Sequence, residues 1–510
     1  MRSEWVGEGM KYGFRLLSVS GSLVRHSRLA GRYQAQAPID VELAPSDESV
    51  ASSWVSVMIG KNGVGKSRLL AAIADIFDRI SRNNLTLQTD NFVLSRVEYL
   101  VGKDRCVIAA QGGRRYELLL NGSQCEPSRM PLPGRIIAVT TSPFDKFRLS
   151  SPVRYDAGIP HLEEAHYAYF GLRDRSGRAS ANASVFRALE GLFDAARGPE
   201  ERRTRIAEVF DFLGFAPVIE VRYATTSSEH KRLQAFAEGV PLAEIVGDAR
   251  TDRIRLLERL DEKSDDMTSI RRYAAEALEL IGKRGELHLQ ADFRNYMEDD
   301  GLFWRMQRLR NLRLIFLRTI EVQRTADGQF IDLRLASSGE LSIVTSFLGL
   351  ASAISESSLV LIDEPEISLH PEWQTRFVDL LTRTFASYSG SHFILATHSP
   401  LILADIDPGA SNVVSLDPDR RRSEDGRQVA GKSIDFLLAT HFDEPGRNNL
   451  YLKEEIIKAL RLAADGKSDT PAYMEILKVL SESLPRLDQD SPVARLIGEL
   501  QEVAERSGRR

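Results

Sequence analysis

One complete G-x-x-x-x-G-K-S pattern constrains this chain more than any other feature: Gly60, Lys61, Asn62, Gly63, Val64, Gly65, Lys66 and Ser67. The apolar segment 54–59 precedes it, and apolar residues at helical spacing follow over residues 67–80. Glycines in such a loop let backbone N–H groups turn inward around phosphate oxygens. We therefore predict a strand, a phosphate-binding loop and a helix whose N-terminus points at the phosphates. Lys66 would reach the β and γ phosphates, and the Ser67 hydroxyl would bind Mg²⁺.

A second buried strand, residues 359–362, runs directly into the two carboxylates of Asp363 and Glu364. Two acids at the end of a buried strand cost free energy unless a cation or a reaction needs them. In a phosphate-binding domain the first acid helps to hold Mg²⁺, and the second polarises an attacking water. We predict that Asp363 joins Ser67 as a metal ligand and that Glu364 is catalytic.

Two further segments belong to the same pattern. The turn Ser337, Ser338, Gly339 and Glu340 opens an apolar helix that continues to Ile354. Such a turn is either a second anion site or a simple capping box, and its place one helix before the Asp-Glu strand favours the anion site. The buried strand 392–396 leads to His398, which we predict to contact the γ-phosphate or the attacking water.

Composition and charge narrow the class of protein. The chain has 510 residues and a formal net charge of −5, so any nucleic-acid site must be a local patch. The two cysteines, Cys106 and Cys125, fit a reducing cytoplasm better than a disulfide framework. We expect no signal peptide and no membrane-spanning helix, and hence a cytoplasmic protein.

The periodicity of the chain predicts four regions. Residues 1–149 form the lobe with the phosphate loop, and residues 150–313 form an insertion with helices over 185–196, 202–213, 254–260, 270–281 and 302–312. Residues 314–416 return to strands at 314–322 and 330–335, and they hold the Asp-Glu strand. Residues 417–510 form a tail with an exposed loop at 417–431 and helices over 433–465 and 471–505.

A cluster of arginines lies near the end of the insertion: Arg305, Arg308, Arg310 and Arg313. These side chains could contact phosphates or a partner. A solvated helix face with structural ion pairs explains them better.

The order of these motifs resembles the ATP-binding-cassette (ABC) ATPases of the SMC/Rad50/RecF/OLD type, over about residues 12–80 and 310–416. The resemblance implies an α/β fold, an ABC-type P-loop ATPase head with a helical insertion and a helical C-terminal tail. It also implies ATP between two heads, with residues 60–67 of one facing residues 337–340 of the other. Asp363 would help to place Mg²⁺, Glu364 would be the catalytic base and His398 the switch histidine.

Other positions follow the family less closely. Residues 368–370 fall where the family's D-loop crosses the dimer interface. Ser338 stands where many cassette proteins have a first glycine. No clear glutamine follows the early strands, so Gln111, Gln124 and the loop 141–147 are all candidates for the missing position in the metal shell.

The segment DEPEISLHPEWQ, with the later THSP, resembles the ATPase subunit of Septu (PtuA-like) anti-phage systems, which also occurs in some retron systems. This resemblance implies a homodimer or higher homo-oligomer and a separately encoded HNH-type nuclease. It leaves open a contact with DNA, or with a retron reverse transcriptase and its RNA–DNA. OLD nucleases continue into a Toprim domain with an acidic cluster. Residues 417–510 lack that pattern, so we expect no nuclease activity in this chain.

Two functions therefore stay open. One is an ATP-binding and hydrolysing subunit of an anti-phage defence complex that regulates the nuclease. The other is a RecF/SMC-like DNA-binding ATPase in DNA repair, which predicts salt-dependent binding to duplex DNA. The long insertion disfavours a transporter ATPase, and metal-dependent cleavage by the purified chain would reveal a nuclease in the tail.

Overall fold

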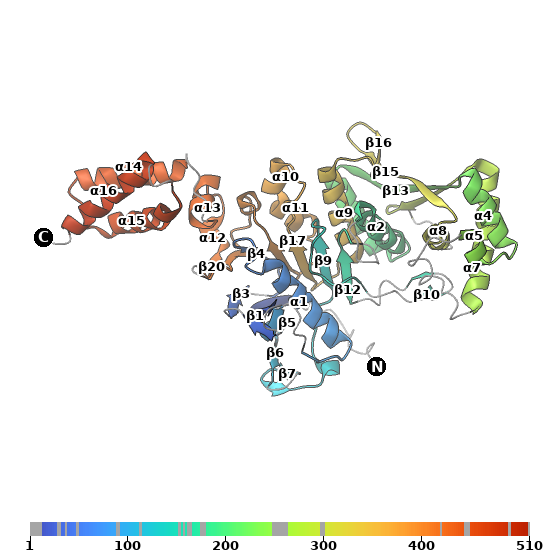
Figure 1. Ribbon diagram of the computed structural model, residues 1–510, viewed down its shortest axis with the longest axis horizontal. Helices are drawn as coiled ribbons and strands as arrows, with labels where there is room; N and C mark the ends of the chain where they lie inside the picture. The colour runs from blue at the N-terminus through green and yellow to red at the C-terminus, as the bar shows by residue number, and fades with distance from the viewer. Residues whose placement is uncertain are drawn as a thin grey trace. The chain divides into compact units, whose positions relative to one another are not determined.

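The computed structural model describes residues 13–27, 32–35, 38–46, 50–87, 92–111, 115–150, 155–156, 159–160, 166–173, 180–246, 264–295, 301–418, 421–442, 449–487 and 491–507. The chain divides into two compact units. Unit 1 comprises Met1–Arg148 and Ser355–Arg510, and unit 2 comprises Leu149–Ile354. In Figure 1 the blue and orange-to-red elements belong to unit 1, and most green and yellow ones to unit 2.

A parallel sheet forms the centre of unit 1. Its strands are β9 (Ile136–Thr140), β17 (Leu359–Asp363), β18 (His392–Ala396), β4 (Trp54–Ile59) and β19 (Ser411–Ser415), in that order. Every residue of these strands is buried, as expected for apolar runs in a sheet with both faces covered. Because the strands are parallel, their carboxyl ends meet at one edge of the sheet.

Helix α1 (Lys66–Ser81) lies between this sheet and a second, antiparallel sheet of unit 1. It packs on β9, β17 and β18 on one side and on β5 on the other. Phe77 of α1 meets the rings of Phe14 and Tyr99 edge-on, at centroid distances of 5.7 and 5.0 Å. This aromatic cluster holds the helix that follows the phosphate loop.

The antiparallel sheet has the order β2-β1-β5-β6-β7-β8, with β3 paired to β1. Its strands are β1 (Phe14–Ser27), β2 (Arg32–Ala35), β3 (Ile39–Glu42), β5 (Phe92–Val101), β6 (Asp104–Ala110), β7 (Tyr116–Leu120) and β8 (Ser123–Gln124), and the short helix η1 (Pro127–Arg129) follows them. Residues 92–120 form a meander in which β5 pairs with β6 and β6 with β7, and residues 112–114 within it lie outside the described ranges.

Short helices connect the later strands of unit 1. Helices α10 (Pro371–Thr375) and α11 (Phe377–Thr384) follow β17, and η3 (Pro400–Leu403) follows β18. These are two separate helices and not one, because Arg376 ends α10 and begins α11.

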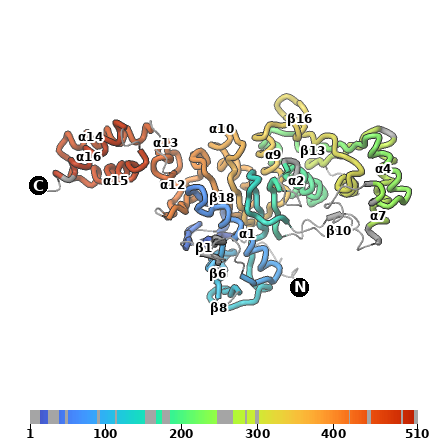
Figure 2. The backbone as a smooth tube through the Cα atoms, in the orientation of Figure 1, coloured from blue at the N-terminus to red at the C-terminus, as the bar shows by residue number. Residues whose placement is uncertain are grey.

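The C-terminal tail of unit 1 is helical. Its helices are α12 (Gly426–Val429), α13 (Ile434–Thr440), α14 (Leu450–Ala464), α15 (Pro471–Ser483) and α16 (Pro492–Ser507), with η4 (Leu484–Arg486) after α15. Buried side chains of α14, α15 and α16 form one core, and the Tyr473 hydroxyl donates to the Leu500 carbonyl at 2.9 Å. Figure 2 shows the backbone path of these helices in red.

The prediction of an exposed loop over 417–431 is wrong. Strand β20 (Arg422–Asp425) pairs antiparallel with β19 and is followed by α12. The physical reason is that β20 is an edge strand made of polar residues, so it carries no apolar alternation that a sequence could reveal.

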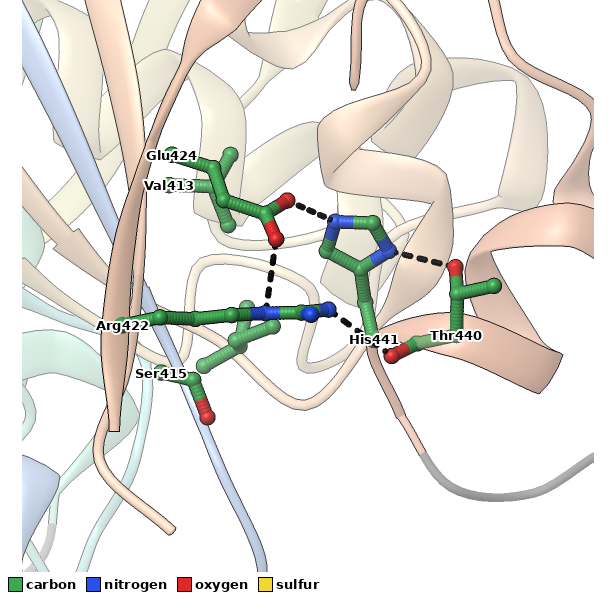
Figure 3. A pocket seen from close by; sticks show the side chains of 7 residues that line it. Val413, Ser415, Arg422, Glu424, Thr440 and His441 are labelled. Atoms are coloured by element: carbon green, nitrogen blue, oxygen red, sulfur yellow. Dashed lines mark hydrogen bonds and ion pairs between the residues drawn. The ribbon is translucent and has the colours of Figure 1, made fainter. Parts of the chain in front are cut away.

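A partly exposed polar cluster joins β20 to the end of α13 (Figure 3). Glu424 Oε2 lies 2.8 Å from His441 Nε2, and Glu424 Oε1 lies 2.7 Å from Arg422 Nε. Arg422 also donates to the Thr440 carbonyl at 3.1 Å, and the Thr440 hydroxyl lies 2.7 Å from His441 Nδ1. The start of the helical tail is thereby fixed to the edge of the parallel sheet.

Unit 2 contains the helices predicted at 185–196, 202–213, 270–281 and 302–312. It also contains an antiparallel sheet, of which the sequence predicted only the strands at 314–322 and 330–335. The helices are α2 (Ala181–Ala196), α3 (Glu200–Phe212), α4 (Ser227–Ala237), α5 (Leu242–Val246), α7 (Ser264–Arg284), α8 (Leu302–Asn311) and α9 (Ser338–Ala353). The sheet has the order β14-β13-β15-β16, with β13 (Phe215–Ala224), β14 (Glu286–Asp292), β15 (Phe316–Arg324) and β16 (Phe330–Asp332). Shorter strands are β10 (Tyr155–Asp156), β11 (Ile159–Pro160) and β12 (Tyr167–Phe170). The helix predicted over 254–260 lies outside the described residues.

Unit 2 also extends further along the chain than residue 313. Strand β15 pairs with β13, and α9 packs on α2 and α3. Residues 314–354 therefore belong to the same compact unit as the insertion. Among the arginines near its end, Arg305 forms a structural ion pair, with Nε 2.8 Å from Glu276 Oε2. No helix in the described ranges of either unit is long and apolar enough to cross a membrane.

Candidate nucleotide-binding site

The phosphate loop connects β4 to α1 in unit 1, as the sequence predicts. Gly60, Gly63 and Gly65 have φ values of 147°, 82° and 112°, which residues with a Cβ rarely adopt. A Cβ on Gly65 would also lie 2.8 Å from Leu23 Cδ1. Gly65 caps α1 without any side-chain hydrogen bond, so the first N–H groups of the helix can face an anion.

Lys66 is almost fully buried, with 3% of its surface exposed. Its ammonium donates to the Gly60 carbonyl at 2.6 Å and lies 2.8 Å from His398 Nε2. Burial lowers the pKa of Lys66 to about 8, although nearby carboxylates oppose the shift. Burial and the Lys66 charge also lower the pKa of His398, so this ring is neutral near pH 7. Lys66 and His398, predicted from distant segments, are in direct contact.

Ser67 and Asp363 form the second contact. The Ser67 hydroxyl donates to Asp363 Oδ1 at 2.9 Å, and Asp363 is only 1% exposed. Burial, together with the neighbouring Glu364, raises the pKa of Asp363 to about 7. The residues fit Mg²⁺, because a hydroxyl and a carboxylate oxygen are hard donors and this ion keeps several water or phosphate ligands.

Glu364 is held by its backbone. Its φ of 51° lies in the left-handed region, where a non-glycine residue is strained. Its N–H donates to the Ala396 carbonyl at 2.9 Å, and its carbonyl accepts from the Thr141 hydroxyl at 2.7 Å. The ends of β18 and β9 therefore hold the backbone of Glu364, whose side chain is half-buried.

The contact from Thr141 also bears on the predicted loop 141–147. This loop reaches the Asp-Glu strand, whereas Gln111 follows β6 and Gln124 lies on β8, both exposed on the antiparallel sheet. Of the three candidates for the missing glutamine position, only the loop is seen to contact the site.

Two carboxylates that the sequence analysis overlooked support this site. Glu366 Oε1 accepts from the His398 N–H at 2.6 Å, and burial raises the pKa of Glu366. Asp417 is 7% exposed, and its Oδ1 accepts from the Lys61 N–H of the phosphate loop at 2.9 Å. Asp417 lies just after the end of β19, and Asp363 lies at the end of β17. An acid at the end of a buried strand was therefore the sequence signal that could have identified Asp417.

The turn Ser337–Glu340 lies in unit 2, whereas the residues above lie in unit 1. It forms a complete capping box: Ser337 Oγ accepts from the Glu340 N–H at 3.3 Å, and Glu340 Oε2 accepts from the Ser337 N–H at 3.2 Å. Hydrogen bonds from Ser337 lower the pKa of Glu340. Ser337, Ser338 and Glu340 are exposed. The capping alternative is therefore confirmed, and an anion-binding role for the turn stays a prediction.

The predicted D-loop segment has a local role that the structure accounts for. Ser368 adopts a φ of 68°, and the exposed His370 caps α10 by accepting from the Glu372 N–H at 3.4 Å. No catalytic contact of His370 is seen among the described residues.

Comparison with known proteins supports an ATPase. Residues 219–404 match a family described as "AAA domain, putative AbiEii toxin, Type IV TA system". This range contains β17 with Asp363 and Glu364, and also His398. Together with the phosphate loop on a parallel sheet, it supports a mixed α/β P-loop fold consistent with that of ABC-type ATPases.

Individual relatives match this chain only in part. A "Retron Vc95 probable ATPase" from Vibrio cholerae serotype O1 biovar El Tor is 28% identical over 31% of this chain and 31% of its own length. "Protein ea59" of Escherichia phage lambda is 37% identical over 14% of this chain and 13% of its own. The chain thus spans less than a third of the length of these curated relatives. A solved SMC head bound to the C-terminal winged-helix domain of ScpA aligns over 78% of this chain and 94% of its own, with 11% identity and a TM-score of 0.33.

Proposed function

We propose that this chain binds ATP with Mg²⁺ and hydrolyses it. The observation that supports this best is the pair of contacts between distant motifs, Lys66 with His398 and Ser67 with Asp363. Lys66 would bind the β and γ phosphates. Ser67 and Asp363 would hold Mg²⁺, which neutralises charge on the phosphates when bound.

Of the two adjacent acids, Glu364 is the better candidate for the general base. Asp363 is buried and engaged with Ser67, whereas Glu364 is half-buried and free of any side-chain hydrogen bond within the described part of the chain. A carboxylate in that position can accept a proton from a water aligned with the γ-phosphate. The neutral His398 ring would donate to the γ-phosphate or orient the water.

ATP would be enclosed between two copies of the chain. In this proposal residues 337–340 of one copy face the phosphate loop of the other, and the N-terminus of α9 contributes its N–H groups to the γ-phosphate. The exposure of Ser337 and Ser338 leaves them accessible for such a contact.

We further propose that this ATPase is a cytoplasmic subunit of a defence complex, in which it regulates a separately encoded HNH-type nuclease. The match to a retron ATPase and the Septu-like motif support the proposal. Helix α14 exposes Leu450, Ile457 and Leu460 by 62%, 48% and 43%, at a spacing that places them on one helix face. This face of the tail is our candidate docking surface, and DNA or a retron reverse transcriptase is a further candidate contact.

Nucleotide binding is tested with Lys66→Ala. Loss of a charged donor to phosphate should weaken ATP affinity by about 10- to 100-fold, measured by calorimetry with Mg²⁺. Lys103→Ala, in the exposed turn between β5 and β6, is a matched control that should leave the affinity unchanged. Equal ATP affinity of Lys66→Ala and the unmodified chain would rule out the phosphate-loop assignment.

The complex is tested by purifying the tagged chain with its native neighbouring genes in the presence of Mg-ATP. A mass that requires a nuclease-sized second protein would support the defence proposal, and Ile457→Asp should remove that protein. A bare dimer that retains duplex DNA in a salt-dependent manner would instead support the RecF/SMC-like alternative.

A further inference from the structure

A cavity of about 140 Å³ lies beside α1 in unit 1, between that helix, β5, β7 and the segment after β9. We call it the α1 cavity. We propose that it binds a mononucleotide, separately from the nucleotide at the phosphate loop. The proposal depends on three observations: a buried arginine with an unused hydrogen-bond donor, an apolar interior and a cationic rim.

Arg79 supplies the first observation. It is 7% exposed, and its Nε has no hydrogen-bond partner among the described residues. Its two other contacts are long, with Nη1 3.5 Å from Asp75 Oδ2 and Nη2 3.4 Å from Asn84 Oδ1. A buried guanidinium with an unused donor costs free energy unless an acceptor approaches it. A carbonyl or ring nitrogen of a base is such an acceptor.

The interior provides space for a flat ring. Its apolar walls come from α1 and from the antiparallel sheet: Ala71, Ala72, Ile76, Phe92, Leu94 and Tyr116. The Tyr116 hydroxyl is already bonded to the Leu94 carbonyl at 3.1 Å, so the tyrosine presents its ring rather than a free polar group. A cavity of this size holds about one aromatic ring, as apolar cavities of about 150 Å³ hold benzene.

The rim provides a site for phosphate. Arg68 is half-buried, and Lys146 and Arg148 are exposed. With Arg79 they give the cavity four cationic side chains against one lining carboxylate, Asp75, in a chain whose net charge is −5. Asp75 Oδ1 lies 2.7 Å from Arg148 Nη1, which holds this arginine at the cavity. A base inside and a phosphate at this rim match a mononucleotide.

The part of the α1 cavity at Arg79 is separate from the proposed ATP site. Arg79 follows Ser67 by more than three turns of α1, about 18 Å along the helix axis. Lys66 and Ser67 point instead to His398 and Asp363. A nucleotide that contacts Arg79 through its base therefore has its own phosphate at the Arg68, Lys146 and Arg148 rim.

In the experiment, the phosphate loop is first occupied by a nucleotide that is not hydrolysed. The full chain is saturated with ATPγS and Mg²⁺, and AMP, GMP, CMP and UMP are titrated in turn by calorimetry. We expect at least one of them to bind at one equivalent per chain. Arg79→Met, which removes the donor, and Ala72→Met, which fills the cavity without changing charge, should each weaken that binding about tenfold or more. Thermal unfolding checks that both variants are folded. If only one of them folds, its mononucleotide affinity is compared with that of the unmodified chain.

Arg82→Ala is the matched control. Arg82 directly follows the last residue of α1, is bonded to Asp78 at 2.8 Å and does not line the cavity. The Arg82→Ala protein should bind the mononucleotide with the same affinity as the unmodified chain. The proposal is overturned if none of the four mononucleotides binds, if both cavity variants bind normally, or if inorganic phosphate binds as well as they do. Binding that persists in Lys66→Ala without ATPγS separates this site from the proposed ATP site.

Discussion

The phosphate site of unit 1 and the Ser337–Glu340 turn of unit 2 are built in opposite ways. In unit 1, buried side chains from distant segments contact one another, as Lys66 does with His398 and Ser67 with Asp363. In unit 2, the side chains of Ser337 and Glu340 bond to each other's backbone N–H groups, three residues apart, and both residues are exposed. The first site is assembled by the fold, whereas the second is complete within a single helical turn.

This difference shows where each region can act. A site assembled from strand ends is preorganised for chemistry before a ligand arrives. A locally capped, exposed helix start can be presented to another surface without reorganising the domain behind it. We therefore expect changes in unit 1 to affect binding and hydrolysis within one copy, and changes in the turn to affect what one copy does for another.

The largest effect should come from Glu364→Gln. The variant keeps size and hydrogen bonding but removes the charge that activates water, so hydrolysis should fall by about 10²-fold or more. ATP affinity should persist, as measured by calorimetry beside the turnover assay. Glu372→Gln, an exposed change in α10, serves as the control. A Glu364→Gln protein that hydrolyses ATP at the normal rate would show that another group is the base.

Ser338→Arg should come next, because it places a bulky side chain on the exposed turn. If the turn completes the site of a second copy, hydrolysis should fall about 10²-fold, the order of loss that misplaced reacting groups cause. ATP affinity should stay normal. Mixing this variant with Lys66→Ala should restore part of the activity, since a hybrid dimer has one intact site. Activity that stays lost in the mixture would contradict action between copies.

A smaller effect concerns pH. Because the pKa of Lys66 is lowered to about 8, the ammonium is present below that pH and is lost as pH rises through it. ATP affinity should therefore fall by up to about tenfold between pH 8 and 9. Lys66→Arg remains charged, so its ATP affinity should be independent of pH over this range. The same slope in both proteins would assign the titration to another group.

The smallest effect should come from Ser337→Ala, which removes the cap of α9 and should lower the free energy of unfolding by about 1 kcal/mol. The pKa of Glu340 is lowered from its usual 4.5 by Ser337. The contribution of the cap is thus present above that pH and is lost as pH falls through the lowered value. Chemical denaturation at pH 7 and pH 4 measures the difference between the two proteins, which should shrink at the lower pH.

The sequence predicted the elements whose pattern is local. Strand β4 begins and ends where the apolar run does, at Trp54 and Ile59, and α1 follows the loop directly. Lys66 and His398 were each predicted to face the phosphates. The contact between them is seen in the structure, because the carboxyl ends of the parallel strands share one edge. Apolar runs and glycine spacing are physical requirements of these elements, so a single sequence carries them.

Features set by pairing over long distances were not predictable in this way. Strand β14 pairs with β13 across the intervening helices, and β20 is a polar edge strand. Glu366 and Asp417 join the site through contacts with residues distant in sequence, the N–H groups of His398 and Lys61. The local sequence around a single acid after a strand does not indicate such a partner. Residues 314–354 join unit 2 through the pairing of β15 with β13, which no local periodicity reveals.

The Glu424–His441 pair gives the tail a mechanical role. Strand β4 pairs with β19, β19 pairs with β20, and the polar cluster connects β20 to α13. Asp417, just past the end of β19, holds the Lys61 N–H. Helix α13 is therefore connected to the phosphate loop through a short path of paired strands. We expect a partner bound to the tail to lie within reach of changes at the proposed nucleotide site.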